Sequence, residues 1–315
     1  MTPEPLNPVE RLARFGLVTP DAARLSRFYQ AALGFRLLGA ERHSESGLAR
    51  STGSDGGAQS ITIGLGREIV ELVQFDQPGR PYPDGGSASD ICFQHFAIVV
   101  ADIALAYQQL CSVSGWTAIS IDGPQRLPLS SGGVAAFKFR DPDGHPLELL
   151  AFPDGKLPAQ WQARSKDRLA LGIDHSAIGV ADSTRSIAFY EALGLRVAAR
   201  SLNTGYEQER LDGVSHPQVE VTALAPCRAT PHVELLCYRT APHHGRIDLR
   251  SSDVAATRLI FEADRGVPEN PGNRQSLIDP DGHHLVIVGS AKSNVSLGER
   301  ATVNAGLPSA STKPE

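Results

Sequence analysis

Short apolar runs and amphipathic stretches follow one another along the chain in an order that recurs four times. Each apolar run ends in an Asp at its eighth position, and an amphipathic stretch such as TRSIAFYEALG then reaches a Gly 12 or 13 residues after that Asp. The Asp is suited to cap the N terminus of a helix, and the Gly to end the helix in a left-handed conformation. The runs are RFGLVTPD (14–21), HFAIVVAD (95–102), HSAIGVAD (175–182) and RIDLRSSD (246–253), and the glycines are Gly34, Gly115, Gly194 and Gly266.

The segment after each Gly is predicted to form strands, because β-branched and aromatic runs alternate there with turn-rich stretches. A similar strand closes each unit, and in the second and fourth units it follows a DPDG turn, at 141–144 and 279–282. The closing strands are VELVQF (70–75), LELLAF (147–152), VELLCY (233–238) and LVIVGS (285–290). The sequence therefore predicts an α+β protein of four β-α-β-β-β modules.

Composition narrows the class of partner. The chain has 315 residues, of which 41% are hydrophobic and 21% charged, and its formal charge of −5 excludes a basic nucleic-acid binder. Its first twenty residues have no apolar segment of the secretory type, and no apolar run is long enough to cross a bilayer. The four cysteines form no C-x-x-C pair, which suits a reducing compartment. We expect a cytoplasmic monomer or homodimer that acts on a small molecule, without membrane or nucleic acid.

The repeated motifs resemble those of the vicinal oxygen chelate superfamily. They are the H-x-A-I-x-V-x-D opening and the DPDGH-x-x-E closing, and with the β-α-β-β-β repeat the resemblance covers about residues 12–290. The superfamily includes glyoxalase I, extradiol dioxygenases, methylmalonyl-CoA epimerase and the fosfomycin and bleomycin resistance proteins. The resemblance implies that modules pair into two cup-shaped mixed sheets and that a metal lies inside a cup. It also implies that the ligands are the first residue of the opening strand and the acidic residue of the closing strand.

These ligand positions decide how the modules pair. Arg cannot ligate a metal, whereas His and carboxylate suit Zn, Ni, Co, Mn or Fe. Pairing the modules in chain order gives two incomplete sites, whereas pairing the two middle modules gives one complete site, so we favour the second arrangement. The middle cup then holds His95, Glu148, His175 and Glu234 as ligands of one divalent transition metal, and the outer cup holds Arg14, Glu71, Arg246 and Val286. The Arg and Glu of the outer cup are predicted to be a structural ion-pair cluster, or else a site for an anionic ligand.

Strand alternation predicts which side chains share the face of these ligands. Their small and apolar character suggests a substrate with an apolar body and two adjacent oxygens. The predicted substrate-binding residues are Ala97, Leu150, Phe152, Ala177, Leu236 and Tyr238. His232 is predicted to share the face of Glu234, and His283, within a turn, is predicted to be solvated.

Along the chain, the pattern predicts two domains of two modules each. The predicted boundaries are an N-terminal extension at 1–11, a first domain at 12–152 with modules 12–77 and 91–152, a linker at 153–171, a second domain at 172–290 with modules 172–240 and 244–290, and a disordered tail at 291–315. The stretch at 78–90 is predicted to be a Pro/Gly-rich linker or a lid loop.

Four protein ligands leave two positions of an octahedral metal for the substrate. The resemblance to glyoxalase implies that Glu148 or Glu234 transfers the substrate proton as the catalytic base. This favours a metal-dependent lyase or isomerase of glyoxalase or epimerase type. An Fe(II)-dependent extradiol dioxygenase, which uses two His and one carboxylate and keeps a position for dioxygen, is the first alternative. A metal-free ligand-sequestering resistance protein is the second.

Overall fold

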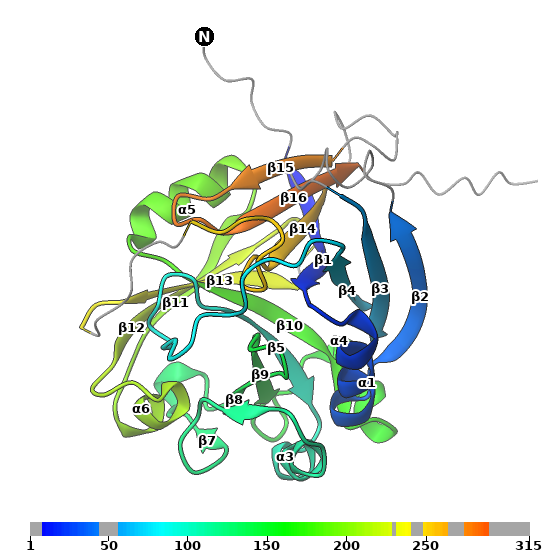
Figure 1. Cartoon of the computed structure of the whole chain (residues 1–315). Coiled ribbons are helices and arrows are strands. Elements are labelled where there is room, and N and C mark those ends of the chain that lie inside the picture. Colours follow the sequence, from blue (N-terminus) through cyan, green and yellow to red (C-terminus); the bar gives the residue numbers. More distant parts are fainter. Residues whose placement is uncertain (1–7, 44–55, 229–230, 241–247, 264–273, 290–315) are drawn as a thin grey trace, which may run out of the picture.

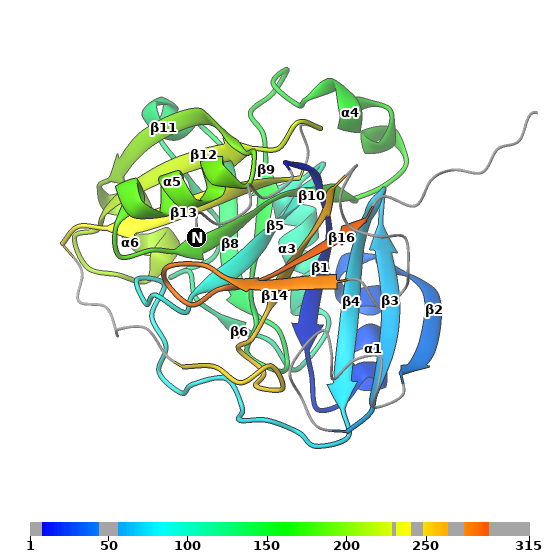
Figure 2. The same ribbon diagram turned by 90° about the horizontal axis from the view of Figure 1, so that it is seen from above.

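Strands from the four repeated units form two mixed sheets, which lie next to each other in Figures 1 and 2. The computed structural model describes residues 8–43, 56–228, 231–240, 248–263 and 274–289. The strand order is β15-β16-β14-β1-β4-β3-β2 in the seven-stranded sheet and β11-β12-β13-β10-β5-β9-β8-β6 in the nine-stranded sheet, where β7 also pairs with β8. Within the described residues, no helix has the length and apolar character that crossing a membrane requires.

The first and last modules build the seven-stranded sheet. β1 and β14 meet at its centre as antiparallel neighbours, and each pairs in parallel with the closing strand of its own module. In chain order the elements are β1 (Val9–Val18), α1 (Ala22–Leu33), β2 (Arg36–His43), β3 (Ala58–Leu65), β4 (Glu68–Phe75), β14 (Arg258–Ala263), β15 (Arg274–Ile278) and β16 (His284–Gly289).

The two middle modules build the nine-stranded sheet in the same way, with β5 and β10 antiparallel at its centre. The elements of the second module are β5 (Gln94–Val100), α3 (Ile103–Cys111), β6 (Thr117–Ala118), β7 (Gln125–Arg126), η1 (Leu129–Ser131), β8 (Ala135–Arg140) and β9 (Pro146–Ala151). Those of the third are β10 (Ala170–Gly179), α5 (Ser183–Ala192), β11 (Arg196–Thr204), α6 (Tyr206–Asp212), β12 (Gln218–Ala225) and β13 (His232–Tyr238). The predicted pairing of middle with middle and outer with outer modules is confirmed.

Each sheet therefore takes one module from each of the predicted domains 12–152 and 172–290, and the division into these domains stays a prediction. The predicted linker at 153–171 holds α4 (Ala159–Gln162) and the short η2 (Arg164–Lys166). Trp161 of α4 is buried against Val99 and Leu171, so this segment is packed onto the larger sheet. β1 begins at Val9, ahead of the predicted start of the first module. The predicted tail at 291–315 lies outside the described residues.

The helix N-caps follow the sequence prediction in the first three modules. Asp21, Asp102 and Asp182 each accept hydrogen bonds from backbone N–H groups in the first turn of α1, α3 and α5. Gly34 ends α1 in the left-handed conformation with φ of 70°. These caps satisfy amide groups that would otherwise have no partner at the start of a helix.

The predicted opening of the fourth module is wrong. Residues 248–256 contain turns and no strand, and β14 lies where the helix after Asp253 was expected. The Asp253 carboxylate accepts hydrogen bonds from the backbone N–H of Arg80, at 2.7 Å, and from its guanidinium, at 2.6 Å. Asp253 thus ties this segment to the 78–90 stretch, and the more apolar RLIFEA segment forms the central strand instead. Arg246 and Gly266 lie outside the described residues.

One apolar core serves both sheets. Phe15 of β1 contacts Phe96 of β5 with ring centroids 5.3 Å apart, and Tyr29 of α1 contacts Phe96 at 6.4 Å. Because side chains alternate along a strand, the residues next to these aromatics point to the other face of each sheet. That other face is the concave one, so the two cups open away from the shared core.

The two DPDGH turns connect modules that belong to different sheets. In each turn the first Asp accepts a hydrogen bond from a helix tyrosine, and the His donates one to a carbonyl at a strand end. The pairs are Tyr29–Asp141 (3.1 Å), Tyr190–Asp279 (3.1 Å), His145–Val18 (2.9 Å) and His283–Gly179 (2.7 Å). His283 is therefore buried rather than solvated as predicted. The turns bind the first module to the second, and the third to the fourth.

Candidate metal centre

The four predicted ligands lie on one face of the larger sheet because of its register. His95 on β5 lies opposite Ala177, and His175 on β10 lies opposite Ala97. Glu148 on β9 is the neighbour of Ala97, and Glu234 on β13 is the neighbour of Ala177. The arrangement is therefore repeated about the β5–β10 seam, with one His and one Glu from each middle module.

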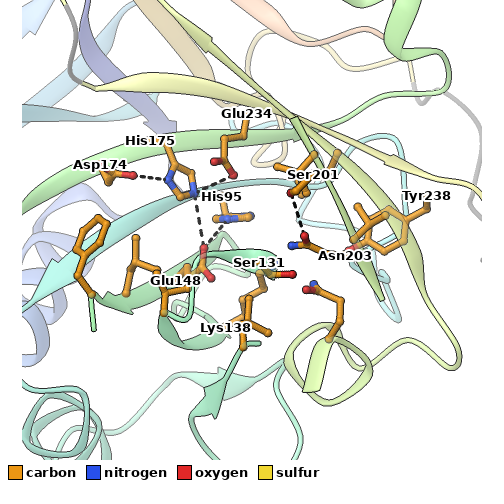
Figure 3. A pocket seen from close by; sticks show the side chains of 18 residues that line it. His95, Ser131, Lys138, Glu148, Asp174, His175, Ser201, Asn203, Glu234 and Tyr238 are labelled. Atoms are coloured by element: carbon orange, nitrogen blue, oxygen red, sulfur yellow. Dashed lines mark hydrogen bonds and ion pairs between the residues drawn. The ribbon is translucent and has the colours of Figure 1, made fainter. Parts of the chain in front are cut away.

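These side chains converge on one point in the middle cup (Figure 3). His95 Nε2 lies 3.0 Å from Glu148 Oε2, and His175 Nε2 lies 3.7 Å from the same oxygen. Glu234 Oε2 lies 3.5 Å from His175 Nε2. His95, Glu148 and His175 each place one possible ligand atom within 4.8 Å of the others, and all three are buried. Glu234 lies at the edge of this three-residue cluster.

Asp174 and His232 support two of the predicted ligands. The Nδ1 atom of His175 lies 2.9 Å from the Asp174 carboxylate, which makes Nδ1 the donor and leaves Nε2 facing the cluster. His232 Nε2 lies 3.4 Å from Glu234 Oε1, as its predicted position on the same face requires. His95 differs, since its buried Nδ1 has no hydrogen-bond partner within the described part of the chain.

The charges of the cluster depend on one another. Burial alone would raise the pKa of Glu148, but hydrogen bonds from His175 and His95 outweigh it and hold this pKa well below its usual value. Burial likewise opposes ionisation of Glu234, yet His175 and His232 lower its pKa to about 2. Burial disfavours the charged form of His175, but Glu234 and its other acidic neighbours raise its pKa well above the usual value. Burial lowers the pKa of His95.

The donor set fits a divalent transition metal. It offers two imidazole nitrogens and carboxylate oxygens, the ligands that Zn, Ni, Co, Mn and Fe accept, at a buried point with two ionised carboxylates. Two negative charges in an apolar cup require a compensating positive charge, which the His175 imidazolium supplies in the metal-free chain. A metal bound by His175 would displace the imidazolium proton, because metals bind the deprotonated form of their ligands.

A cavity of about 210 Å³ lies over the cluster. This is below the roughly 300–1,000 Å³ typical of sites for drug-sized ligands, and therefore suits a smaller molecule. Four of the predicted substrate-binding residues line it: Leu150, Phe152, Leu236 and Tyr238. The other two, Ala97 and Ala177, have no exposed surface and pack beneath Leu150 and Leu236 as part of the floor.

Several polar residues of the cavity were missed by the sequence reasoning. Lys138 on β8 is buried directly opposite Glu148, and its Nζ atom lies 2.7 Å from Asp212 Oδ1. Burial disfavours the Lys138 ammonium, but Asp212 and the cluster carboxylates raise its pKa. Strand alternation in AAFKFR indicates that Lys138 faces the cavity, because the phenylalanines on either side of it face the core. Nothing in the sequence indicates that Asp212 of α6 would meet it.

The outer cup has different residues at the corresponding positions. Arg14 matches His95, Glu71 matches Glu148 and Val286 matches Glu234 in strand register. The fourth position belongs to Arg258, which lies opposite Gly16, and not to the predicted Arg246. Arg14 forms an ion pair with Glu71. Arg258 is buried, which lowers its pKa to about 10, and its guanidinium donates to the carbonyl of Ser251.

Comparisons with known proteins agree with the fold described above. Residues 11–149 match the sequence model of the Glyoxalase/Bleomycin resistance protein/Dioxygenase superfamily. Glyoxalase I from Zea mays is similar in structure, with a TM-score of 0.53 and 19% identity over 89% of this chain and 92% of that one. A putative dioxygenase from Bacillus subtilis subsp. subtilis str. 168 is also similar in structure, with a TM-score of 0.55 and 12% identity over 90% of this chain and 86% of that one. No curated protein matches the sequence. At such identities the structural likenesses establish the fold alone.

Proposed function

We propose that this chain, in which residues 11–149 match the Glyoxalase/Bleomycin resistance protein/Dioxygenase superfamily, is a metal-dependent enzyme that catalyses proton transfer on a small substrate with two adjacent oxygens. The observation that carries this proposal is the buried cluster of His95, Glu148 and His175, with Glu234 at its edge. The reaction class is that of a glyoxalase- or epimerase-like lyase or isomerase.

The proposal gives the two glutamates different roles. The Glu148 side chain is 8% exposed and contacts both histidines, so it would hold the metal together with His95 and His175. The Glu234 side chain is 22% exposed, lines the cavity and lies at the edge of the cluster, so the proposal makes it both the fourth, most accessible ligand and the base that takes and returns the substrate proton. When bound, the metal supplies Lewis-acid stabilisation of negative charge on the substrate oxygens. Leu150 and Phe152 give this cavity an apolar wall.

One experiment tests the proposal directly. The protein is purified without chelators, its metal content is measured, and it is reconstituted separately with Zn, Ni, Co, Mn and Fe. Each form is then incubated without dioxygen in deuterated buffer with metal-chelating hydroxy-carbonyl compounds. We expect about one metal per chain, and deuterium exchange at the carbon next to the chelating oxygens. A chain that takes up none of these metals contradicts the proposal and favours the ligand-sequestering alternative.

The three-residue cluster also favours a second candidate. Two His and one carboxylate form the ligand set of non-haem Fe(II) oxygenases, and His95, His175 and Glu148 are of these types. If Glu234 stays bonded to His232 instead of binding the metal, the chain has the ligand set of an extradiol dioxygenase. Turnover of a catechol that requires both Fe(II) and dioxygen would establish this function and exclude proton transfer as the main reaction.

A further inference from the structure

Asp212 lies behind the cavity wall and binds three residues that line it. Its buried carboxylate accepts three hydrogen bonds of 2.7 Å, from Lys138 Nζ to Oδ1 and from Gln208 Nε2 and the Tyr238 hydroxyl to Oδ2. These donors come from β8, α6 and β13, so one side chain fixes groups from both middle modules. Figure 3 shows Lys138 and Tyr238 on the walls of the cavity beyond the cluster.

Gln208 has an acceptor that nothing in the described chain uses. Its amide orientation is set by Asp212, because only the NH₂ group can donate to a carboxylate. The Oε1 atom is consequently the free end, and it is buried with no hydrogen-bond partner within the described residues. Gln208 lines the cavity and is 4% exposed as a residue. A buried acceptor of this kind is unfavourable unless a ligand or an ordered water donates to it.

Lys138 supplies a donor that binds the same Asp212 carboxylate as Gln208. Its ammonium group has three protons, and the Asp212 bond uses one of them. Lys138 and Gln208 donate to the two oxygens of a single carboxylate, and both residues line the cavity. The same part of the wall therefore contains a donor and an acceptor.

The pair selects among chemical groups. A hydroxyl both accepts from an ammonium and donates to an amide oxygen, so it satisfies Lys138 and Gln208 together. A carboxylate would meet Lys138 but would face the Gln208 oxygen and Asp212. An ammonium would meet Gln208 but would face Lys138 at close range. A methyl group would leave both polar groups unsatisfied.

We propose that Lys138 and Gln208 form a hydroxyl-binding subsite, so that the substrate carries a hydroxyl group in addition to the two adjacent oxygens that the metal takes. This inference rests on the proposed function, since it assumes that the substrate is anchored at the His95–Glu148–His175 cluster. It changes the expected substrate from one with an apolar body alone to one that also carries a hydroxyl group on the Lys138 and Gln208 side of the cavity.

The test uses hydroxamates, which chelate metals through two adjacent oxygens. Butano-, pentano- and hexanohydroxamate are compared with the counterparts that carry a terminal hydroxyl or a terminal carboxylate, by calorimetry on the Zn-loaded protein. At the chain length that reaches the subsite, we expect the hydroxylated ligand to bind about tenfold more tightly than the alkyl ligand. We also expect it to bind more tightly than the carboxylated one.

Two variants identify the residue responsible. Gln208→Met preserves size and removes the acceptor, and we expect it to abolish the preference for the hydroxylated ligand. Gln218→Met is the matched control, because Gln218 is exposed at the start of β12, and the preference should persist. Equal binding of alkyl and hydroxylated ligands at every length, or preference for the carboxylate, overturns the subsite while leaving the metal centre intact. Failure of every hydroxamate to bind the Zn-loaded protein contradicts the proposed function itself, and the subsite with it.

Discussion

The two cups are built on the same scaffold and differ at four side chains. In the middle cup, His95, Glu148, His175 and Glu234 surround a common point. In the outer cup, Arg14, Glu71, Arg258 and Val286 hold the same register positions. Arg14 reaches Glu71 directly, and Arg258 lies over the ring of Phe75. The charged side chains of the outer cup are thus paired within that cup. In the middle cup, the possible metal-ligand atoms face one another beside a cavity.

This difference shows that strand register alone does not make a metal site. Both sheets bring four side chains together at the seam between two modules, but a guanidinium occupies the place of an imidazole and cannot ligate. Conversely, the two carboxylates of the middle cup need a compensating cation, whereas the one carboxylate among the four outer-cup positions, Glu71, is paired with the permanently charged Arg14.

The largest effect is expected for Glu234→Gln. The amide keeps the shape of the side chain but cannot accept a proton, so turnover should fall by about 10²–10⁴-fold while metal content is retained. Glu148→Gln should also lose turnover, together with part of the metal affinity, because it contacts both histidines. Turnover and elemental analysis measure the two properties. Glu220→Gln, on the other face of β12, is the control, and full activity in Glu234→Gln would exclude its role as base.

The next largest effect, on metal affinity, is expected when one imidazole of the middle cup is removed. His95→Ala or His175→Ala is expected to lower metal affinity by at least about 100-fold, because a missing ligand costs more than the roughly 10–100-fold of a lost supporting residue. Arg14→Ala, at the matching position of the outer cup, should leave about one metal per chain. Competition with a chelator measures both affinities. Loss of metal in Arg14→Ala would show that the outer cup contributes to binding.

The first DPDGH turn makes the stability of the fold depend on pH. His145 donates through Nε2 to the Val18 carbonyl and through Nδ1 to Asp141. Burial opposes its charge, but Asp141 and its other partners raise its pKa above the usual value. A raised pKa stabilises the fold below about pH 6.5, and this stabilisation is lost as pH rises through the folded-state value.

We therefore expect His145→Gln to lower the free energy of unfolding by about 3 kcal/mol near pH 6 and by less near pH 9. Chemical denaturation at the two pH values measures the difference. His216→Gln is the control, because that side chain is exposed in a turn. A loss that grows with rising pH would contradict the charged state assigned to His145.

The smallest effect is expected in the outer cup itself. The side chain of Arg14 is 39% exposed and that of Glu71 is 13% exposed, so solvent screens their ion pair. Arg14→Met should lower the free energy of unfolding by about 1 kcal/mol or less, with the loss reduced further in high salt. Denaturation curves at two salt concentrations test this. A loss of several kcal/mol would mean that the pair is a central support of the smaller sheet.

The sequence predicted those features that depend on local chemistry. Asp21, Asp102 and Asp182 cap their helices because an Asp before a helical pattern does so in most contexts. The pairing of modules followed from chemistry too, because only one arrangement completes a set of ligands. The ligand assignments themselves remain predictions, although their positions converge.

The remaining features depend on contacts between distant segments. The fourth module differs from the prediction because RIDLRSSD has the spacing of an opening strand, but its last residue, Asp253, accepts a hydrogen bond from Arg80, which is distant in the sequence. The RLIFEA segment lacks a following helical pattern of the usual length, so its role as the central strand was not recognised. The Lys138–Asp212 pair joins residues from two modules, and no period or motif in the sequence links them.

The central position of β1 also has a consequence for synthesis of the chain. β1 ends at Val18, and its neighbour β14 begins at Arg258, 240 residues later. At about 5–20 residues per second a ribosome needs roughly 12–48 s to make that stretch. For this time one edge of β1 has no partner, and such an edge is prone to pair with other nascent chains. Arg11 and Arg14 place charges on that edge, and we expect chains without them to aggregate during translation more readily than after folding.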